Sequence, residues 1–313
     1  MPDTSHFSKD VPGLRLVWSP TTLASYMCDP LAYYWRHVAG YKTEAHSLAQ
    51  VWGSAYHEAI AEYWKARLGG ASRQEAVEAG ARKGLEHREQ FRAALSEARL
   101  KDAKVRNMRT LLRAVVWYDY KYGDDGRFTP VWLHEGQPAI ELDFAIPLGK
   151  ACTGEDYVLT GVLDQIMKDD MGRLVVVERK TTTRTITSGY YWQQYNPSVQ
   201  VWCYDLAGAE LLPKEPLHGV VVEACQTAVH FCDFERHEVV RTPEQRAHWR
   251  ECLLYWIKRA EQDALNGNWS KAMNPATMVW ETPFRRLQAK PPSMWSTLLD
   301  IEFVRGETFD GME

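Results

Sequence analysis

Residues 160–183 read TGVLDQIMKDDMGRLVVVERKTTT and predict two neighbouring strands joined by a short turn. The first strand, the turn and the start of the second strand are expected at residues 161–167, 169–172 and 174–177. The apolar run that opens the second strand is too short for a helix. Asp164 and Glu178 are therefore expected to meet across a hairpin.

The acids of this hairpin and a nearby lysine have the chemistry of a metal site. Two carboxylates that converge repel each other unless a cation lies between them, and their hard oxygen atoms suit magnesium or manganese. Lys180 follows Glu178 by two residues, so both side chains emerge on one face of the strand. Its ammonium group could orient or help deprotonate an attacking water. The alternative is a surface hairpin with a solvated Glu and Lys.

The bulk composition indicates an ordinary globular protein. The chain has 313 residues, of which 45% are hydrophobic and 12% are aromatic, enough for a large core. No apolar run reaches membrane-spanning length, and the N-terminal residues are polar. We therefore expect a soluble, cytoplasmic protein without membrane contact. Its six cysteines are scattered without a C-x-x-C pair, which favours reduced thiols over a zinc ribbon.

The net charge of -4 gives no overall attraction to nucleic acid, so a phosphate-binding surface has to be local. One basic segment stands out, with a single acid, Asp102, among six basic residues: Arg99, Lys101, Lys104, Arg106, Arg109 and Arg113. We interpret Arg106, Arg109 and Arg113 as candidate DNA-binding residues. A solvated helix face explains the same pattern equally well.

Periodicity and capping residues predict a helical first third followed by strands. Helices are expected from residue 19 to about 39 and at 48–68, 72–95, 101–122, 199–212 and 242–267. Strands are expected at 140–146 and 217–225 and at 228–235, besides the two of the hairpin. This order describes an α/β protein with one mixed central sheet flanked by helices. We expect a mainly helical lobe at 1–137, a core at 138–268 and an irregular tail at 269–313.

Three motifs occur in order along the chain: Gly161-x-x-Asp164, Glu178-x-Lys180-Thr181 and Gln200-x-x-x-Tyr204. Together they resemble the PD-(D/E)XK nuclease superfamily, in particular its RecB-like and Cas4-like exonuclease branch. The segment GSAYHE at residues 53–58 and the opening helix at residues 19–34 agree with that branch. The resemblance implies a restriction-endonuclease-like core with an N-terminal helical lobe.

The resemblance also implies roles for individual residues. The metal ligands would be His57, Asp164, Glu178 and the backbone carbonyl of Arg179, and Lys180 would be the catalytic base or water-orienting cation. Gln200 and Tyr204, one helical turn apart, would touch the phosphate backbone or brace Lys180. Thr181 and Thr182 could bind a phosphate, although threonines are also common at strand ends. Further acids that could serve are Glu58, Glu62 and Glu141.

The sequence departs from the branch in two ways. Many members hold an iron-sulfur cluster with four cysteines, but here only Cys28 is suitably placed, and the tail at residues 269–290 resembles the cluster region without its cysteines. We therefore predict no iron-sulfur cluster. Arg179 replaces the apolar residue that is common between the acid and the lysine, and we expect its side chain to point into solvent or toward DNA.

The function expected from these features is a Mg2+-dependent deoxyribonuclease, with Mn2+ able to substitute. An exonuclease that acts at DNA ends in recombination, repair or phage DNA processing is favoured. DNA is the expected binding partner. A helicase, an annealing protein or another recombination protein is a candidate protein partner. The sequence leaves the oligomeric state open. The alternatives are a nucleic-acid-binding or assembly subunit with little activity, and a structure-specific endonuclease on the same core.

Overall fold

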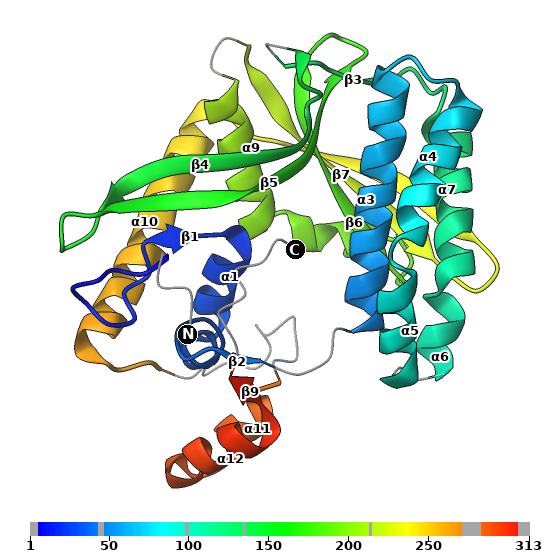
Figure 1. Cartoon of the computed structure of the whole chain (residues 1–313). Helices are drawn as coiled ribbons and strands as arrows, with labels where there is room; N and C mark the ends of the chain where they lie inside the picture. Colours follow the sequence, from blue (N-terminus) through cyan, green and yellow to red (C-terminus); the bar gives the residue numbers. More distant parts are fainter. Residues whose placement is uncertain are drawn as a thin grey trace. The chain divides into compact units, whose positions relative to one another are not determined.

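The computed structural model describes residues 6–42, 47–97, 100–133, 136–212, 215–270 and 283–305 (Figure 1). The chain divides into two compact units: residues 1–44, 144–161 and 243–313 form the first, and residues 45–143 and 162–242 form the second. These units do not follow the expected boundaries at 137 and 268, because two long strands carry the chain out of the second unit and back. Of the expected tail, residues 271–282 and 306–313 lie outside the described residues.

Strand pairing produces a mixed sheet in the order β1-β5-β6-β7-β8, with β3 and β4 also paired to β5. The strands are β1 (Val17–Trp18), β3 (Phe128–Pro130), β4 (Ile140–Lys150), β5 (Asp156–Asp169), β6 (Leu174–Thr182), β7 (Leu217–Thr227) and β8 (Cys232–Val240). The β5–β6 and β7–β8 pairs are antiparallel and the β6–β7 pair is parallel. The predicted α/β class with a mixed sheet flanked by helices is confirmed.

The β5–β6 hairpin forms at the predicted place. Its register pairs Lys168 with Leu174 and continues to Gln165 opposite Val177. Asp169 closes the turn, since its Oδ1 accepts hydrogen bonds from the Met171 and Arg173 backbone N–H groups at 3.0 and 2.8 Å. Gly172 has φ +78°, a conformation that glycine adopts without strain. The turn residues alone thus account for the hairpin.

Helices cover both faces of the sheet within the second unit. On one face lie α3 (Leu48–Leu68), α4 (Arg73–Leu85) and α7 (Met108–Tyr122), and on the other lies α9 (Val199–Leu211) (Figure 1). Val175 and Val177 belong to one buried cluster with side chains of α3 and α7. A Cβ atom on Gly208 of α9 would be 2.6 Å from Val176 Cγ2, so successive β6 residues face opposite helix layers.

Two predicted helices are each split in the structure. The one expected at 72–95 consists of α4 and α5 (Arg88–Glu97), and the one expected at 101–122 consists of α6 (Leu100–Val105) and α7. Asn107 explains the second break: its side chain caps α7 at the Thr110 N–H and donates to the Ala103 carbonyl of α6. A side chain that satisfies both helix ends stabilises the interruption.

The first unit combines short helices with one long one. It contains α1 (Pro20–Cys28), α2 (Pro30–Tyr33), a π-helical turn (Tyr34–Val38), α10 (Pro243–Asn266), α11 (Arg285–Gln288), α12 (Trp295–Glu302), and the paired strands β2 (Tyr41–Lys42) and β9 (Val304–Arg305). Ser19 begins α1 with the predicted capping geometry, and the Tyr26 hydroxyl of α1 donates to Asp263 of α10 at 2.7 Å. None of the helices within the described residues has the length and hydrophobicity of a membrane span.

Candidate active site

The predicted catalytic side chains gather in the second unit, where the β5–β6 ladder stops. Pairing ends at Gln165 opposite Val177, and the next residues along the two strands are Asp164 and Glu178. Asp164 is only 9% exposed and Glu178 only 2% exposed. Buried carboxylates require a positive partner or a hydrogen-bond donor, and both acids have one.

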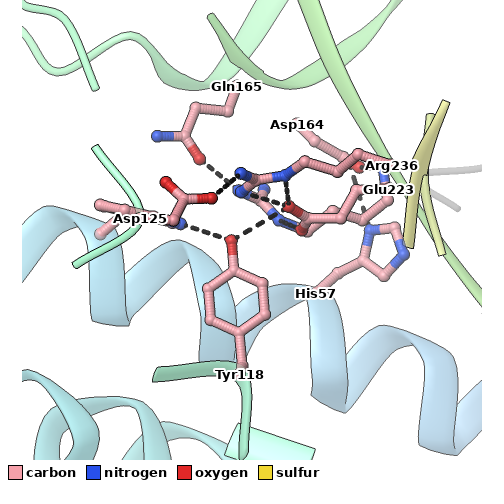
Figure 2. Close-up of polar contacts among 9 residues, drawn as sticks. His57, Tyr118, Asp125, Asp164, Gln165, Glu223 and Arg236 are labelled. Carbon is pink, nitrogen blue, oxygen red and sulfur yellow. Dashed lines mark hydrogen bonds and ion pairs between the residues drawn. The ribbon is translucent and has the colours of Figure 1, made fainter. Parts of the chain in front are cut away.

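Asp164 is held by α3 and by β6. His57 Nδ1 of α3 lies 3.3 Å from Asp164 Oδ1, and the Arg179 backbone N–H donates to Asp164 Oδ2 at 2.7 Å (Figure 2). Burial alone would raise the pKa of Asp164, but His57 and then Arg179 outweigh it and lower this pKa to about 2. Burial would lower the pKa of His57, yet Asp164 raises it overall. The two groups therefore favour an imidazolium–carboxylate pair.

Glu178 is more deeply buried and less well satisfied. Its Oε1 lies 2.5 Å from Lys180 Nζ, whereas its Oε2 has no hydrogen-bond partner among the described residues. Burial raises the pKa of Glu178 to about 7; Lys180 opposes the rise, and the nearby charge of Asp164 adds to it. An acceptor oxygen in this position is stabilised by an additional cation.

Lys180 is connected to α9 by a chain of hydrogen bonds. Its Nζ donates to Gln200 Oε1 at 2.6 Å, and Gln200 Nε2 donates to the Tyr204 hydroxyl at 3.1 Å. Burial raises the pKa of Tyr204 well above its ordinary value, so the hydroxyl stays neutral. Of the two expected roles for Gln200, bracing Lys180 matches this geometry.

The two threonines lie at the end of β6 and are half-buried. Thr181 faces α3, where a Cβ atom on Gly53 would be 3.4 Å from its Oγ1. Thr182 Oγ1 accepts a hydrogen bond from the Arg184 backbone N–H at 3.0 Å. Thr182 thus borders the loop that follows β6, whereas Thr181 borders α3.

The alternative acids are placed differently from one another. Glu58 pairs with Lys83 at 3.2 Å and with His87 at 3.1 Å, which commits it to the α3–α4 packing. Glu62 is half-buried one helical turn further along α3. Glu141 is the second residue of β4 and has φ +53°, which is uncommon for a residue other than glycine. Burial and then Asp164 raise the pKa of Glu141 to about 7, although its exposed surface allows solvent to screen the effect.

The predicted basic residues do not form one free surface. Arg113 donates to the carbonyl oxygens of Val229 at 2.8 Å and Phe231 at 3.1 Å, in the β7–β8 turn. Arg106 Nη1 lies 3.6 Å from Asp102. Arg109 is the exposed one of the three, so among these arginines a DNA contact would depend mainly on it.

The expectation that Arg179 points into solvent or toward DNA is wrong. The residue is 1% exposed, and its Nε donates to Glu223 Oε1 of β7 at 3.2 Å. Strand alternation explains this burial, because Arg179 shares the face of Val175 and Val177, which α3 and α7 cover. Glu223 was not singled out from the sequence, although an acid within the apolar run GVVVEAC was a signal for a buried charge pair.

The donor atoms of this site fit a hard divalent cation. Asp164 and Glu178 supply carboxylate oxygens, His57 supplies a ring nitrogen, and Glu178 Oε2 is a buried acceptor without a hydrogen-bond partner among the described residues. In the same part of the chain, no three His, Cys, Asp or Glu side chains lie close enough to hold an ion together. One oxygen of each carboxylate is already in contact with a side chain, Asp164 Oδ1 with His57 and Glu178 Oε1 with Lys180.

Comparison with known proteins agrees with this chemistry. The profile of the PD-(D/E)XK nuclease superfamily matches residues 17–275. The chain belongs to this superfamily. Membership in the PD-(D/E)XK nucleases indicates hydrolysis of nucleic acid with a divalent metal, and the mixed sheet flanked by helices is consistent with their restriction-endonuclease-like fold.

One solved structure similar to this PD-(D/E)XK chain is titled "Crystal structure of SSO0001". The two share 11% sequence identity with a TM-score of 0.35, and the match covers 89% of this chain and 86% of the other. No curated protein matches the chain.

Proposed function

We propose that this protein is an exonuclease of the RecB-like and Cas4-like branch, which hydrolyses phosphodiester bonds at DNA ends with Mg2+. The observation that carries the proposal is the convergence of His57, Asp164, Glu178, Lys180 and Gln200. These side chains come from α3, β5, β6 and α9 of one unit. One contact links His57 to Asp164, and two others link Glu178 to Lys180 and Lys180 to Gln200. Such convergence of acid, base and bracing groups is typical of an active site.

The residues divide into metal ligands and a water-orienting group. His57, Asp164, Glu178 and the Arg179 carbonyl would hold Mg2+, or Mn2+ in its place. The bound ion would polarise the phosphate and lower the pKa of an attacking water. Lys180 has three N–H donors, of which one bonds Gln200 and one contacts Glu178. The third can hold the attacking water or a phosphate oxygen.

DNA contacts would come from the edge of this site. Thr181 and Thr182 would bind the phosphate next to the cleaved one, and Arg109 would add charge at a distance. Products with 5'-phosphate and 3'-hydroxyl ends are expected, as in the branch. A role in recombination, repair or phage DNA processing, with a helicase or annealing protein as partner, is consistent with this activity.

The test is cleavage of end-labelled linear single- and double-stranded DNA with Mg2+, with Mn2+ and with chelator. Lys180→Ala is compared with Lys168→Ala, a lysine of β5 that lies 3.4 Å from Glu215 and whose side chain is 42% exposed. We expect metal-dependent products, a loss of about 100-fold or more in Lys180→Ala, and wild-type rates in Lys168→Ala. No cleavage by a folded, metal-binding wild type would instead favour a DNA-binding or assembly subunit.

A further inference from the structure

Arg179 belongs to a buried charge network on the face of the sheet opposite Lys180. Figure 2 shows Gln165, Glu223, Arg236, Asp125 and Tyr118 in one cluster beside Asp164 and His57. Glu223 is 1% exposed, and its Oε2 lies 2.7 Å from Arg236 Nη2 and accepts from the Tyr118 hydroxyl at 3.3 Å.

The charges of this network are balanced as two ion pairs. Arg179 pairs with Glu223 at 3.2 Å, and Arg236 pairs with Asp125 at 3.0 Å. Burying a guanidinium is costly, and apolar side chains of similar volume often give equal or greater stability. Stability alone therefore does not explain an arginine next to Glu178. Because Glu223 offsets the charge of Arg179, the arginine can lie near a cation site with little net repulsion.

Arg179 links β6 to β5 next to the point where the β5–β6 ladder ends. Its backbone N–H donates to Asp164 at 2.7 Å, and its guanidinium donates to the Gln165 side-chain oxygen. The β5–β6 ladder ends at Gln165 opposite Val177, one residue before Asp164. The guanidinium also bonds Glu223, which lies opposite Arg179 on β7. One residue thus connects β5, β6 and β7 beside the two carboxylates.

We propose that Arg179 is a positioning residue that fixes the spacing of Asp164 and Glu178 for the cation. The Arg179 guanidinium holds its place by hydrogen bonds to Gln165 and Glu223. The Arg179 backbone N–H holds the Asp164 carboxylate. The inference rests on the proposed function, because it assumes that both carboxylates bind the ion. The side chain of Arg179, the variable residue of the acid-x-Lys motif, thereby has a role in metal binding that is separate from the role of its backbone carbonyl.

The experiment compares two double variants, each of which removes one arginine and one acid of the network. Both variants also lose the Arg236–Glu223 ion pair, so this loss is matched between them. Arg179→Met with Glu223→Gln removes the pair next to Asp164, and Arg236→Met with Asp125→Asn removes the outer pair. Both leave the network neutral and change side-chain volume in the same way. Mn2+ affinity is measured by titration calorimetry or by electron paramagnetic resonance, thermal unfolding is measured in parallel, and kcat is determined at saturating Mn2+.

We expect the Kd for Mn2+ to rise about tenfold or more in the first variant and to change less than about twofold in the second. An unchanged Kd in the first variant, or equal shifts in both, overturns the inference. If the first variant does not fold, Arg179→Lys serves instead, since it keeps the charge but loses the planar fork. A severalfold rise in Kd is then expected, and a wild-type Kd overturns the inference. If the wild type cuts DNA but the variants do not show these changes in Kd, only the role of Arg179 is overturned and the proposed function stands. If the wild type neither binds Mn2+ nor cuts DNA, the proposed function and the role of Arg179 are both overturned.

Discussion

Lys180 is restrained on two sides, by an acid of its own strand and by an amide of α9. The contacts to Glu178 Oε1 at 2.5 Å and to Gln200 Oε1 at 2.6 Å leave its ammonium group little freedom. Reactions that depend on an oriented water are sensitive to such restraint, because a displacement of about 1 Å can cost about 100-fold in rate. The position of the lysine therefore depends on Gln200 as much as on the strand.

Replacement of Gln200 by alanine should reduce turnover without weakening metal binding. Lys180 would lose its α9 acceptor while Asp164 and Glu178 stay in place, so we expect kcat to fall about 10- to 100-fold with an unchanged Kd for Mn2+. Single-turnover cleavage and Mn2+ titration measure the two quantities. Gln74→Ala, at an exposed residue of α4 bonded to Glu78, is the control and should keep both. A fall in Mn2+ affinity equal to the fall in kcat would contradict the bracing role.

At the scale of elements, helix packing places His57 over the sheet. α3 carries His57 and is held by α4 through close backbone contact at Gly80, where a Cβ atom would be 2.7 Å from the Ala59 carbonyl oxygen and 3.3 Å from Val115. In the first unit, α10 carries the buried acid Glu261, which accepts from the Cys152 N–H at 2.7 Å and from the Tyr157 hydroxyl at 2.5 Å. The position of α3 in the second unit thus depends on Gly80, and the position of α10 in the first unit depends on Glu261.

Gly80→Ala should destabilise the second unit. The added methyl group meets backbone rather than a flexible side chain, so α3 and α4 have to separate, at a cost of about 1–3 kcal/mol in the free energy of unfolding. Chemical denaturation gives this value. Gly189→Ala is the matched control, because no atom lies within 4 Å of its added Cβ, and a change within about 0.5 kcal/mol is expected. Equal effects of both substitutions would show that the α3–α4 contact tolerates the methyl group.

Glu261→Gln should lower stability in a pH-dependent way. Burial would raise the pKa of Glu261, but the bonds from Tyr157, the Cys152 N–H and Lys258 lower it below its ordinary value of 4.5. A carboxyl with a lowered folded-state pKa stabilises the protein above the unfolded pKa, and this contribution is lost as the pH falls through the folded pKa.

We expect Glu261→Gln to cost about 1–3 kcal/mol at pH 7, with the difference from wild type shrinking as the pH falls below about 4.5. Urea unfolding at pH 7 and at several acidic pH values measures it. Glu251→Gln on the same helix, with a side chain that is 81% exposed, should behave like wild type throughout. A difference for Glu261→Gln that does not vary with pH would contradict the ionic contribution.

At the scale of the whole molecule, superfamily membership extends over residues 17–275, whereas the proposed chemistry lies within the second unit. The net charge of -4 gives no general attraction to DNA, so binding has to arise at local groups such as those around Lys180. Local binding with few phosphate contacts has a shallow salt dependence. Substrate selection then depends on which DNA geometry can reach the buried carboxylates.

The proposed exonuclease activity predicts that linear DNA is degraded and closed circles stay intact. A buried site with two carboxylates at 9% and 2% exposure favours a strand that enters from an end. We expect linear single- or double-stranded DNA to be shortened progressively, while circular single strands and covalently closed plasmid persist under the same conditions. Gel analysis after matched digestion measures this. Cleavage of circles at a rate comparable to linear DNA would assign the chain as an endonuclease.

Local sequence patterns were sufficient for the elements that carry the chemistry. The hairpin follows from period-two alternation and the turn residues Asp169 and Gly172, and two helix starts follow from the capping residues Ser19 and Ser72. The meeting of Asp164 with Glu178 was predictable because it requires only a short hairpin. These features depend on interactions between residues close together in the chain, which a sequence displays directly.

Tertiary structure alone determined which charges are buried and what they contact. Arg179 bonds Glu223 from 44 residues away, and Tyr118 bonds the same acid from 105 residues away. Arg113, expected at a DNA surface, instead bonds the β7–β8 turn. Such partners belong to distant segments of the chain, and the local periodicity of the sequence does not predict these contacts. The sequence by itself thus determined the motif and its strands, whereas long-range packing of α3, α7 and β7 decided how those residues are held, since burial depends on what the rest of the chain places on top.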